Sequence, residues 1–167
     1  MIYKIPRTVS VGGLGKTKRI EIGGNAPVSI QTMWKEGIVS VLNDRNALDS
    51  ILYRINELSQ IGCDLIRFAV PDMDSAKALC LIAENTSMPL VADIHFDYKL
   101  ALECLKGNVA KIRINPGNIG SKENDISVEI FSRMDNVPLI DKYKAFQILD
   151  DEWSRISGDI ELIQTEG

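Results

Sequence analysis

Two short apolar runs separated by one helix length most constrain what this chain can fold into. The runs are Leu90–Ile94 and Val109–Ile114, and the sequence between them predicts a helix over Tyr98–Leu105. Continuous apolar runs that alternate with helices are typical of parallel strands covered on both faces. In such sheets, ligands bind beyond the carboxyl ends of the strands. We therefore expect the functional residues at that end of the sheet.

The same alternation is found earlier in the chain. It predicts strands over Pro27–Met33 and Asp64–Val70, a helix over Asn43–Ile61, and a second helix capped by Asp72 or Asp74. Thr17–Ile22 is expected to form either a short hairpin or an irregular entry to the fold. The fold class is therefore α/β, with about four β/α units. Since a complete barrel has eight strands in about 250 residues, we expect a partial (β/α) TIM-type barrel.

The charge pattern divides the chain into two parts, residues 1–122 and 123–167. Residues 121–167 contain eleven acidic and five basic residues, whereas the whole chain has a net charge of −4. Apolar residues recur there every three or four positions, at Ala145, Leu149, Trp153, Ile156, Ile160 and Ile163. This spacing predicts an acidic, amphipathic helical tail. The net negative charge also argues against a general nucleic-acid-binding protein.

Cysteine usage and hydropathy indicate a cytoplasmic protein. The chain has three widely spaced cysteines and no CxxC motif, which favours reduced thiols over a disulfide framework. We expect Cys63, Cys80 and Cys104 to be small buried residues and not metal ligands. No run of about 18 apolar residues is present, so we expect no membrane partner, and the amino terminus lacks the pattern of a signal peptide.

Five polar residues are the candidate site: Arg67, Asp93, His95, Arg113 and Asn115. Side chains alternate along a strand, so Asp93 shares a face with His95, and Arg113 shares a face with Asn115. If the strands form an arc of a barrel, these groups converge at its carboxyl-terminal mouth. A site of this composition would bind an anion.

Residue types alone leave the roles of these groups open. A guanidinium within an apolar strand needs an anion, and an internal ion pair with Asp64, Asp93 or Asp97 is the simplest one. A bound phosphate is the alternative. His95 is either a satisfied core or rim residue, a hydrogen-bond donor or a proton shuttle. Asp93 could accept from a ligand hydroxyl, orient His95 or cap the next helix.

Three segments carry a family resemblance: DLIRFAVPDMDSA, VADIHFDY and RINPGNIG. Residues 4–122 resemble the amino-terminal barrel of the 4-hydroxy-3-methylbut-2-enyl diphosphate synthase family. The resemblance implies reductive ring opening of 2-C-methylerythritol 2,4-cyclodiphosphate in isoprenoid biosynthesis, with electrons passing from ferredoxin or flavodoxin through a [4Fe–4S] cluster. It also implies that the five candidate residues hold the substrate and that the two arginines bind its diphosphate.

The resemblance also sets limits on this sequence. The cluster cysteines of that family lie in a separate carboxyl-terminal domain, so their counterparts are absent from these 167 residues. We therefore expect the chain to supply the diphosphate-binding half and to be inactive alone. Trp34 stands where many members have a small polar residue, which leaves the role of the first strand open.

Two other functions compete with this interpretation. The first is a non-catalytic truncated or fused product whose tail covers a sheet edge or mediates oligomerisation, since a half-barrel would expose the edges of its first and fourth strands. The second is a pterin-type barrel enzyme acting on anionic substrates. The tail weakly resembles a type I restriction–modification methyltransferase subunit, but it contains none of that family's cofactor or base-flipping motifs, so no methylation activity is implied.

Overall fold

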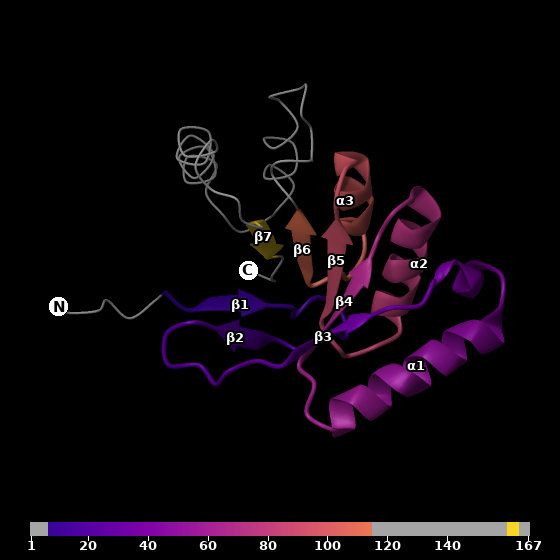
Figure 1. Cartoon of the computed structure of the whole chain (residues 1–167). Helices are drawn as coiled ribbons and strands as arrows, with labels where there is room; N and C mark the ends of the chain where they lie inside the picture. The colour runs from indigo at the N-terminus through magenta and orange to yellow at the C-terminus, as the bar shows by residue number, and fades with distance from the viewer. Residues whose placement is uncertain (1–6, 115–159, 164–167) are drawn as a thin grey trace.

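A curved sheet with helices on one face forms the body of the protein (Figure 1). The computed structural model describes residues 7–114 and 160–163. The sheet has the order β3-β4-β5-β6-β7, in which β3 to β6 are parallel and β7 is antiparallel. Its strands are β3 (Gln31–Trp34), β4 (Leu65–Ala69), β5 (Leu90–Ile94), β6 (Lys111–Ile114) and β7 (Ile160–Ile163). The expected partial barrel is confirmed by these parallel strands and the helices that connect them.

The connecting helices begin at side-chain caps that the sequence specifies. The helical elements are η1 (Val39–Leu42, a 3₁₀-helix), α1 (Arg45–Gln60), α2 (Met73–Glu84) and α3 (Tyr98–Cys104). Asp72 is the cap of α2, because its carboxylate accepts a hydrogen bond from the Ser75 backbone N–H, which also lowers the Asp72 pKa. Asp97 caps α3 through the Lys99 N–H. Asp93 is therefore not a helix cap.

One face of the sheet is apolar and covered by the helices. Alternate strand residues, including Ile66, Phe68, Ala92, Ile94 and Ile112, are buried in a core shared with α1, α2 and α3. Burial of such side chains contributes about 1.5–3 kcal/mol each. We call this the helix-covered face, and the opposite one the inner face.

Trp34 belongs to the helix-covered face and not to the ligand side of the sheet. Its ring stacks on Phe68, with the centroids 5.3 Å apart. The guanidinium carbon of Arg54 lies 4.5 Å from the centroid of the Trp34 ring, and Arg54 also pairs with Glu36. Trp34 therefore contributes to the packing beside α1 and not to the inner face of the sheet.

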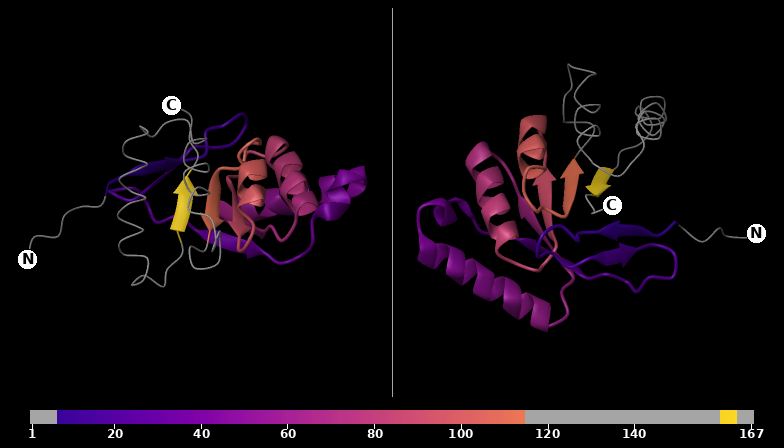
Figure 2. Two further views of the ribbon diagram at one scale, coloured as in Figure 1. Left: turned by 90° about the horizontal axis from the view of Figure 1, so that it is seen from above. Right: turned by 180° about the vertical axis from the view of Figure 1, so that it is seen from behind.

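A hairpin lies across the amino ends of the strands (Figures 1 and 2). Its strands are β1 (Val9–Val11) and β2 (Ile20–Ile22), as the sequence predicted for this region. The hairpin and the sheet share a small apolar cluster made of Val11, Ile20, Ile22, Leu65, Val91 and Ala110. The backbone N–H of Lys18 also donates to the Ser87 carbonyl over 2.8 Å. This end of the sheet is thus closed by protein, and the carboxyl end is where a ligand can approach.

Strand β7 corrects two expectations about the tail. Ile160 and Ile163 were assigned to an amphipathic helix, but Ile160–Ile163 form a strand that pairs with β6, with Ile160 opposite Ile114 and Ile163 opposite Lys111. Unpaired N–H and C=O groups of β6 supply the physical reason, because backbone pairing satisfies them. The expected free edge of the fourth strand is therefore wrong, since β7 covers it.

The other edge of the sheet ends at β3, which pairs only with β4 among the residues that the structure describes. The rest of the tail lies outside the described residues, as does the boundary near residue 122. Within the described ranges, no helix is long and apolar enough to cross a membrane.

Candidate anion-binding site

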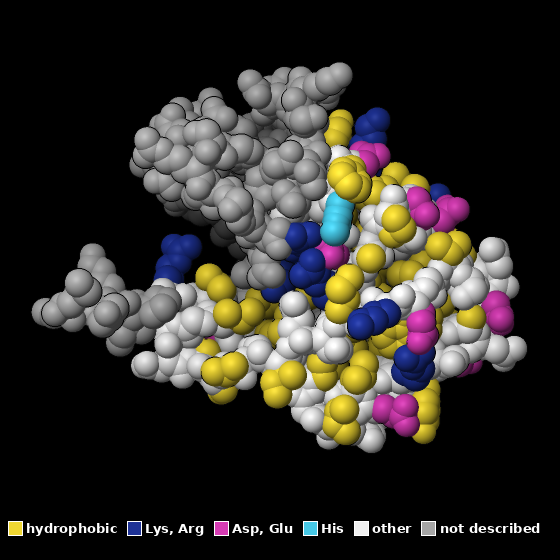
Figure 3. All heavy atoms as spheres, viewed as in Figure 1, with side chains coloured by type: hydrophobic (Ala, Val, Ile, Leu, Met, Phe, Trp, Pro, Cys, Tyr) yellow, Lys and Arg dark blue, Asp and Glu magenta, His cyan; other side chains and the backbone are white. Residues whose placement is uncertain are grey.

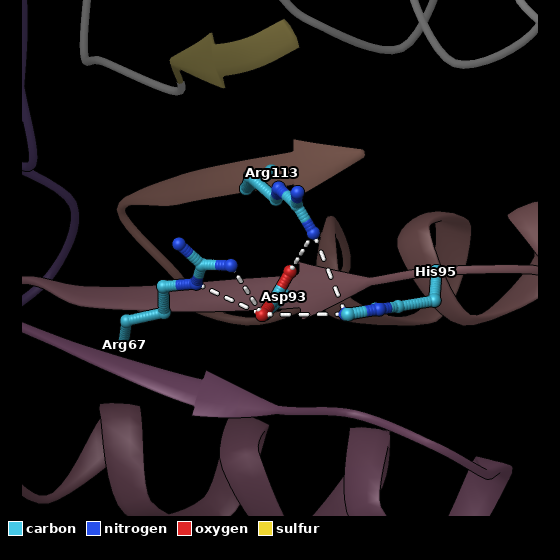
Figure 4. Close-up of polar contacts among 4 residues, drawn as sticks. All are labelled: Arg67, Asp93, His95 and Arg113. Carbon is cyan, nitrogen blue, oxygen red and sulfur yellow. Dashed lines mark hydrogen bonds and ion pairs between the residues drawn. The ribbon is translucent and has the colours of Figure 1, made fainter. Parts of the chain in front are cut away.

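Arg67, Asp93 and Arg113 come from three neighbouring strands and meet on the inner face (Figure 4). The register places Arg113 directly opposite Asp93, while Arg67 lies opposite Val91, one inner-face position earlier on β5. Because strand side chains alternate, all three point to the same side of the sheet. His95 follows two residues after Asp93 and reaches the same group.

Asp93 binds both arginines at once. Its Oδ2 accepts from Arg67 Nε at 2.9 Å and from Arg67 Nη2 at 2.6 Å, and its Oδ1 accepts from Arg113 Nη1 at 2.8 Å. These are charge-assisted hydrogen bonds, which are stronger than bonds between neutral groups. The internal ion pair that the residue types suggested is therefore present, with Asp93 as the partner. Asp64 instead accepts from the Ile30 N–H, and Asp97 caps α3.

The exposure of these side chains rises from the centre of the group to its rim. The side chains of Asp93 and Arg113 are 1% and 8% exposed, that of Arg67 is 23% exposed, and that of His95 is 44% exposed. A buried carboxylate is costly unless it is paired, and Asp93 has both oxygens paired. Asp93 thus holds two positive groups close together, where they would otherwise repel one another.

Arg67 keeps one donor nitrogen unused by this network. Its Nε and Nη2 bind Asp93, and no hydrogen bond from its Nη1 to any described residue is found. Figure 4 shows this nitrogen directed away from Asp93. An arginine fork that is oriented by one carboxylate and retains a free donor is suited to a second anion.

His95 lies at the outer edge of the group. Its Nε2 is 3.4 Å from Arg113 Nη1 and 3.6 Å from Asp93 Oδ2. Nε2 thus faces both a guanidinium, which can only donate, and a carboxylate, which can only accept, so its role depends on the tautomer of the ring. On the molecular surface the single histidine lies beside basic side chains and an acidic one (Figure 3).

A pocket of about 310 Å³ adjoins the group at the carboxyl ends of β4 and β5. Its lining consists of Ala69, Val70, Pro71, Asp93, His95, Phe96, Asp97 and Leu100. The two arginines are not among these residues, so the pocket lies beside the guanidiniums and shares Asp93 and His95 with them. An apolar pocket with a few polar groups on one side is the usual form of a small-molecule site.

The structure brings four of the five predicted site residues together. Arg67, Asp93, His95 and Arg113 form one connected group, and Asn115 lies outside the described residues. Sequence reasoning missed Lys111, which is buried on the inner face opposite Val91, two residues before Arg113. The alternation rule that paired Arg113 with Asn115 would have identified it.

The described cysteines do not fit an iron–sulfur cluster, which requires several thiolates around one centre. Cys63 lies beside Ile30 and Leu65, with its Sγ 3.0 Å from the Leu65 carbonyl oxygen, whereas Cys80 and Cys104 belong to α2 and α3. No group of three or more His, Cys, Asp or Glu residues able to hold a metal occurs within residues 7–114.

Comparison with known proteins identifies relatives of this chain. Three relatives share the name 4-hydroxy-3-methylbut-2-en-1-yl diphosphate synthase (flavodoxin). The Treponema denticola protein is 58% identical over 120 residues, which are 72% of this chain and 30% of the relative. The Treponema pallidum protein is 52% identical over 70% of this chain and 28% of its own length. For the Clostridium perfringens protein, the identity is 44% over 83% of this chain and 36% of the relative.

The chain thus spans about a third of the length of these relatives. The family model for the GcpE TIM-barrel domain matches residues 9–139 of the 167. That range includes every described strand of the parallel sheet and the whole Arg67–Asp93–Arg113 group. The chain therefore belongs to the GcpE TIM-barrel domain family.

Proposed function

We propose that the inner face of this half-barrel binds the diphosphate group of 2-C-methylerythritol 2,4-cyclodiphosphate. The observation that carries the proposal is the convergence of Arg67 and Arg113 on the single buried carboxylate of Asp93. Asp93 orients both guanidiniums, and Arg67 retains Nη1 as a donor that no described residue uses, so the group is preorganised for a further anion. The site lies at the carboxyl ends of parallel strands, where barrels of this kind bind their ligands.

Each residue has a distinct role in the proposal. Arg67 and Arg113 contact the phosphoryl oxygens, and Asp93 orients both arginines without touching the phosphate. His95 donates from the rim to a phosphoryl oxygen or to a ligand hydroxyl. Asn115, which lies outside the described residues, is proposed as a further polar contact because it follows Arg113 by two positions. The adjoining pocket would receive the carbon skeleton of the ligand.

We do not propose that the described residues carry out the reductive step implied by the family resemblance. In the whole enzyme, an iron–sulfur cluster would supply the electrons. The cluster would receive them from flavodoxin, which the names of the relatives specify, or from ferredoxin. Because the described cysteines do not form a ligand set for such a cluster, the proposed role of this segment is to bind and position the substrate. We further propose a cytoplasmic location, supported by the odd number of widely spaced cysteines.

One observation favours a second, non-catalytic role for part of the chain. Strand β7 pairs with β6, at the edge that would otherwise be open to another strand. We propose that the tail covers this edge, which leaves the β3 edge for pairing with a second copy of the chain. Val28 and Ile30, just before β3, are 93% and 57% exposed, which is consistent with such a contact.

A thermal melt of the purified chain with and without the cyclic diphosphate tests the binding proposal. Ligand at a hundredfold excess over its dissociation constant adds about 2.7 kcal/mol of stability by mass action, so the midpoint should rise. A melt in pterin diphosphate is the comparison. Stabilisation by the pterin compound and not by the cyclic diphosphate would favour the pterin-type alternative, and stabilisation by neither would overturn the proposed site.

A further inference from the structure

Two cysteines outside the proposed site lie against each other between α2 and α3. Cys80 belongs to α2, and Cys104 is the last residue of α3. The Cys80 Sγ is 3.6 Å from the Glu103 carbonyl oxygen and 3.9 Å from that of Cys104. The two thiols also lie close enough to shift each other's pKa, which is lowered at Cys80 and raised at Cys104. All three cysteines are free, and Cys63 lies elsewhere, where its Sγ contacts the carbonyl oxygens of Ile30 and Leu65.

Gly107 provides the space in which the Cys80 thiol lies. A Cβ at Gly107 would be 2.8 Å from the Cys80 Sγ and 2.9 Å from its Cβ, closer than nonbonded atoms approach. A side chain at this position would therefore displace the Cys80 thiol. The turn that follows α3 thus leaves room for Cys80 beside the end of α3.

The two thiols differ in a way that assigns them separate roles in oxidation. Cys80 is partly exposed, and the hydrogen bond from Cys104 lowers its pKa, although burial and the charges of Glu103 and Glu84 act in the opposite direction. Cys104 is fully buried, and its bond to Cys80 together with burial raises its pKa. Because Cys80 is partly exposed and Cys104 is fully buried, an oxidant reaches Cys80 first.

We propose that Cys80 and Cys104 are a peroxide-sensitive thiol pair that oxidises to a disulfide joining α2 to α3. Hydrogen peroxide takes two electrons from Cys80, forming a sulfenic acid and one water molecule. The Cys104 sulfur then attacks the Cys80 sulfur, the S–S bond forms, and a second water molecule leaves. The balance is two thiols and one peroxide giving one disulfide and two waters.

The disulfide would join the two helices that begin beside the pocket. Helix α2 begins just after Pro71, and α3 begins just after Asp97, and both residues line the pocket. The helices pack side by side (Figures 1 and 2). A covalent bond between them would restrict how far the loops after β4 and β5 can move apart.

Counting thiols before and after peroxide treatment tests the pair directly. The full chain, reduced and then exposed to hydrogen peroxide, is denatured and labelled with a maleimide. We expect labelled thiols to fall from three to one, and peptide mapping without reductant to show Cys80 linked to Cys104. Cys63→Ala should form the same linkage, whereas Cys80→Ala and Cys104→Ala should form none. If Cys104→Ala fails to fold, Cys80→Ala alone decides.

Three results would overturn the proposal. They are a linkage that includes Cys63, a linkage between chains, and conversion of Cys80 to sulfinic acid with Cys104 still labelled. The readout is a covalent bond, so it stands whether or not the inner face binds a diphosphate.

Discussion

The two faces of the parallel sheet are built from the same strands, but one face packs the core and the other forms the candidate site. On β4, Ile66 and Phe68 pack under the helices, and Arg67 between them enters the polar group of the inner face. On β5, Asp93 likewise lies between the buried Ala92 and Ile94. Strand alternation thus separates residues that hold the fold from residues that form the site, one position apart.

A large effect on stability is expected on the helix-covered face. Phe68→Ala should lower the free energy of unfolding by about 3–5 kcal/mol, because it removes a ring that is 1% exposed and stacked on Trp34. Chemical denaturation measures the change. Phe96→Ala is the matched control, since Phe96 is 74% exposed and its loss should change stability by less than about 0.5 kcal/mol. Equal effects of the two substitutions would contradict this assignment of the core.

Asp93→Asn tests whether one inner-face residue also supports the fold. The substitution leaves two guanidiniums facing each other around a neutral amide, and breaking such a buried pair costs about 3–5 kcal/mol. We expect added inorganic pyrophosphate to recover part of this loss, because it supplies the missing negative charge. Denaturation curves with pyrophosphate and with an equal ionic strength of chloride separate specific recovery from screening. A loss that both salts recover equally would argue against an anion site.

Arg67→Lys should separate binding from stability. Lysine keeps the charge but loses the planar fork that contacts Asp93 through two nitrogens. We expect affinity for the cyclic diphosphate to fall by about tenfold or more, as the loss of one charge-assisted hydrogen bond predicts. The melting midpoint should fall much less than it does in Asp93→Asn. Arg54→Lys, which alters an arginine on the helix-covered side, should leave the affinity unchanged. Affinity that falls equally in both variants would mean that the ligand binds by non-specific electrostatic attraction and not at the proposed site.

The smallest expected effect concerns the sheet edges. If the β3 edge pairs with a second copy, then Ile30→Lys should shift the chain toward monomer in light scattering across a concentration series, because a charged side chain on an edge strand opposes pairing. Tyr53→Lys adds the same charge at another exposed position, on α1, and should not alter the association. A purely monomeric parent chain would exclude the proposed pairing.

Most of the fold follows from local patterns in the sequence. The strands and helices from β3 to β6 were predicted because apolar periodicity, capping aspartates and glycine stops agree along this region. The strand predicted over Pro27–Met33 is shorter in the structure, where regular pairing with β4 begins at Gln31. Strand β7 was missed because Ile160 and Ile163 also fit a helical spacing, and its partner β6 lies some fifty residues earlier in the chain.

The site was predictable as a set of residues but not as a network. Alternation paired Asp93 with His95 and Arg113 with Asn115, and only the expected barrel brought them toward Arg67. Asp64, Asp93 and Asp97 all remained possible partners for the arginines. The choice depends on strand register, which puts Arg113 opposite Asp93 and not opposite a neighbouring residue. Register is a tertiary property that composition and spacing leave open.

The most direct test of the binding account is calorimetric titration of the 167-residue chain with 2-C-methylerythritol 2,4-cyclodiphosphate, beside its Arg67→Lys variant. The account predicts one site per chain in the parent and a dissociation constant at least about tenfold weaker in the variant. No heat of binding in a parent chain that melts cooperatively would contradict it, as would equal affinities in two folded proteins.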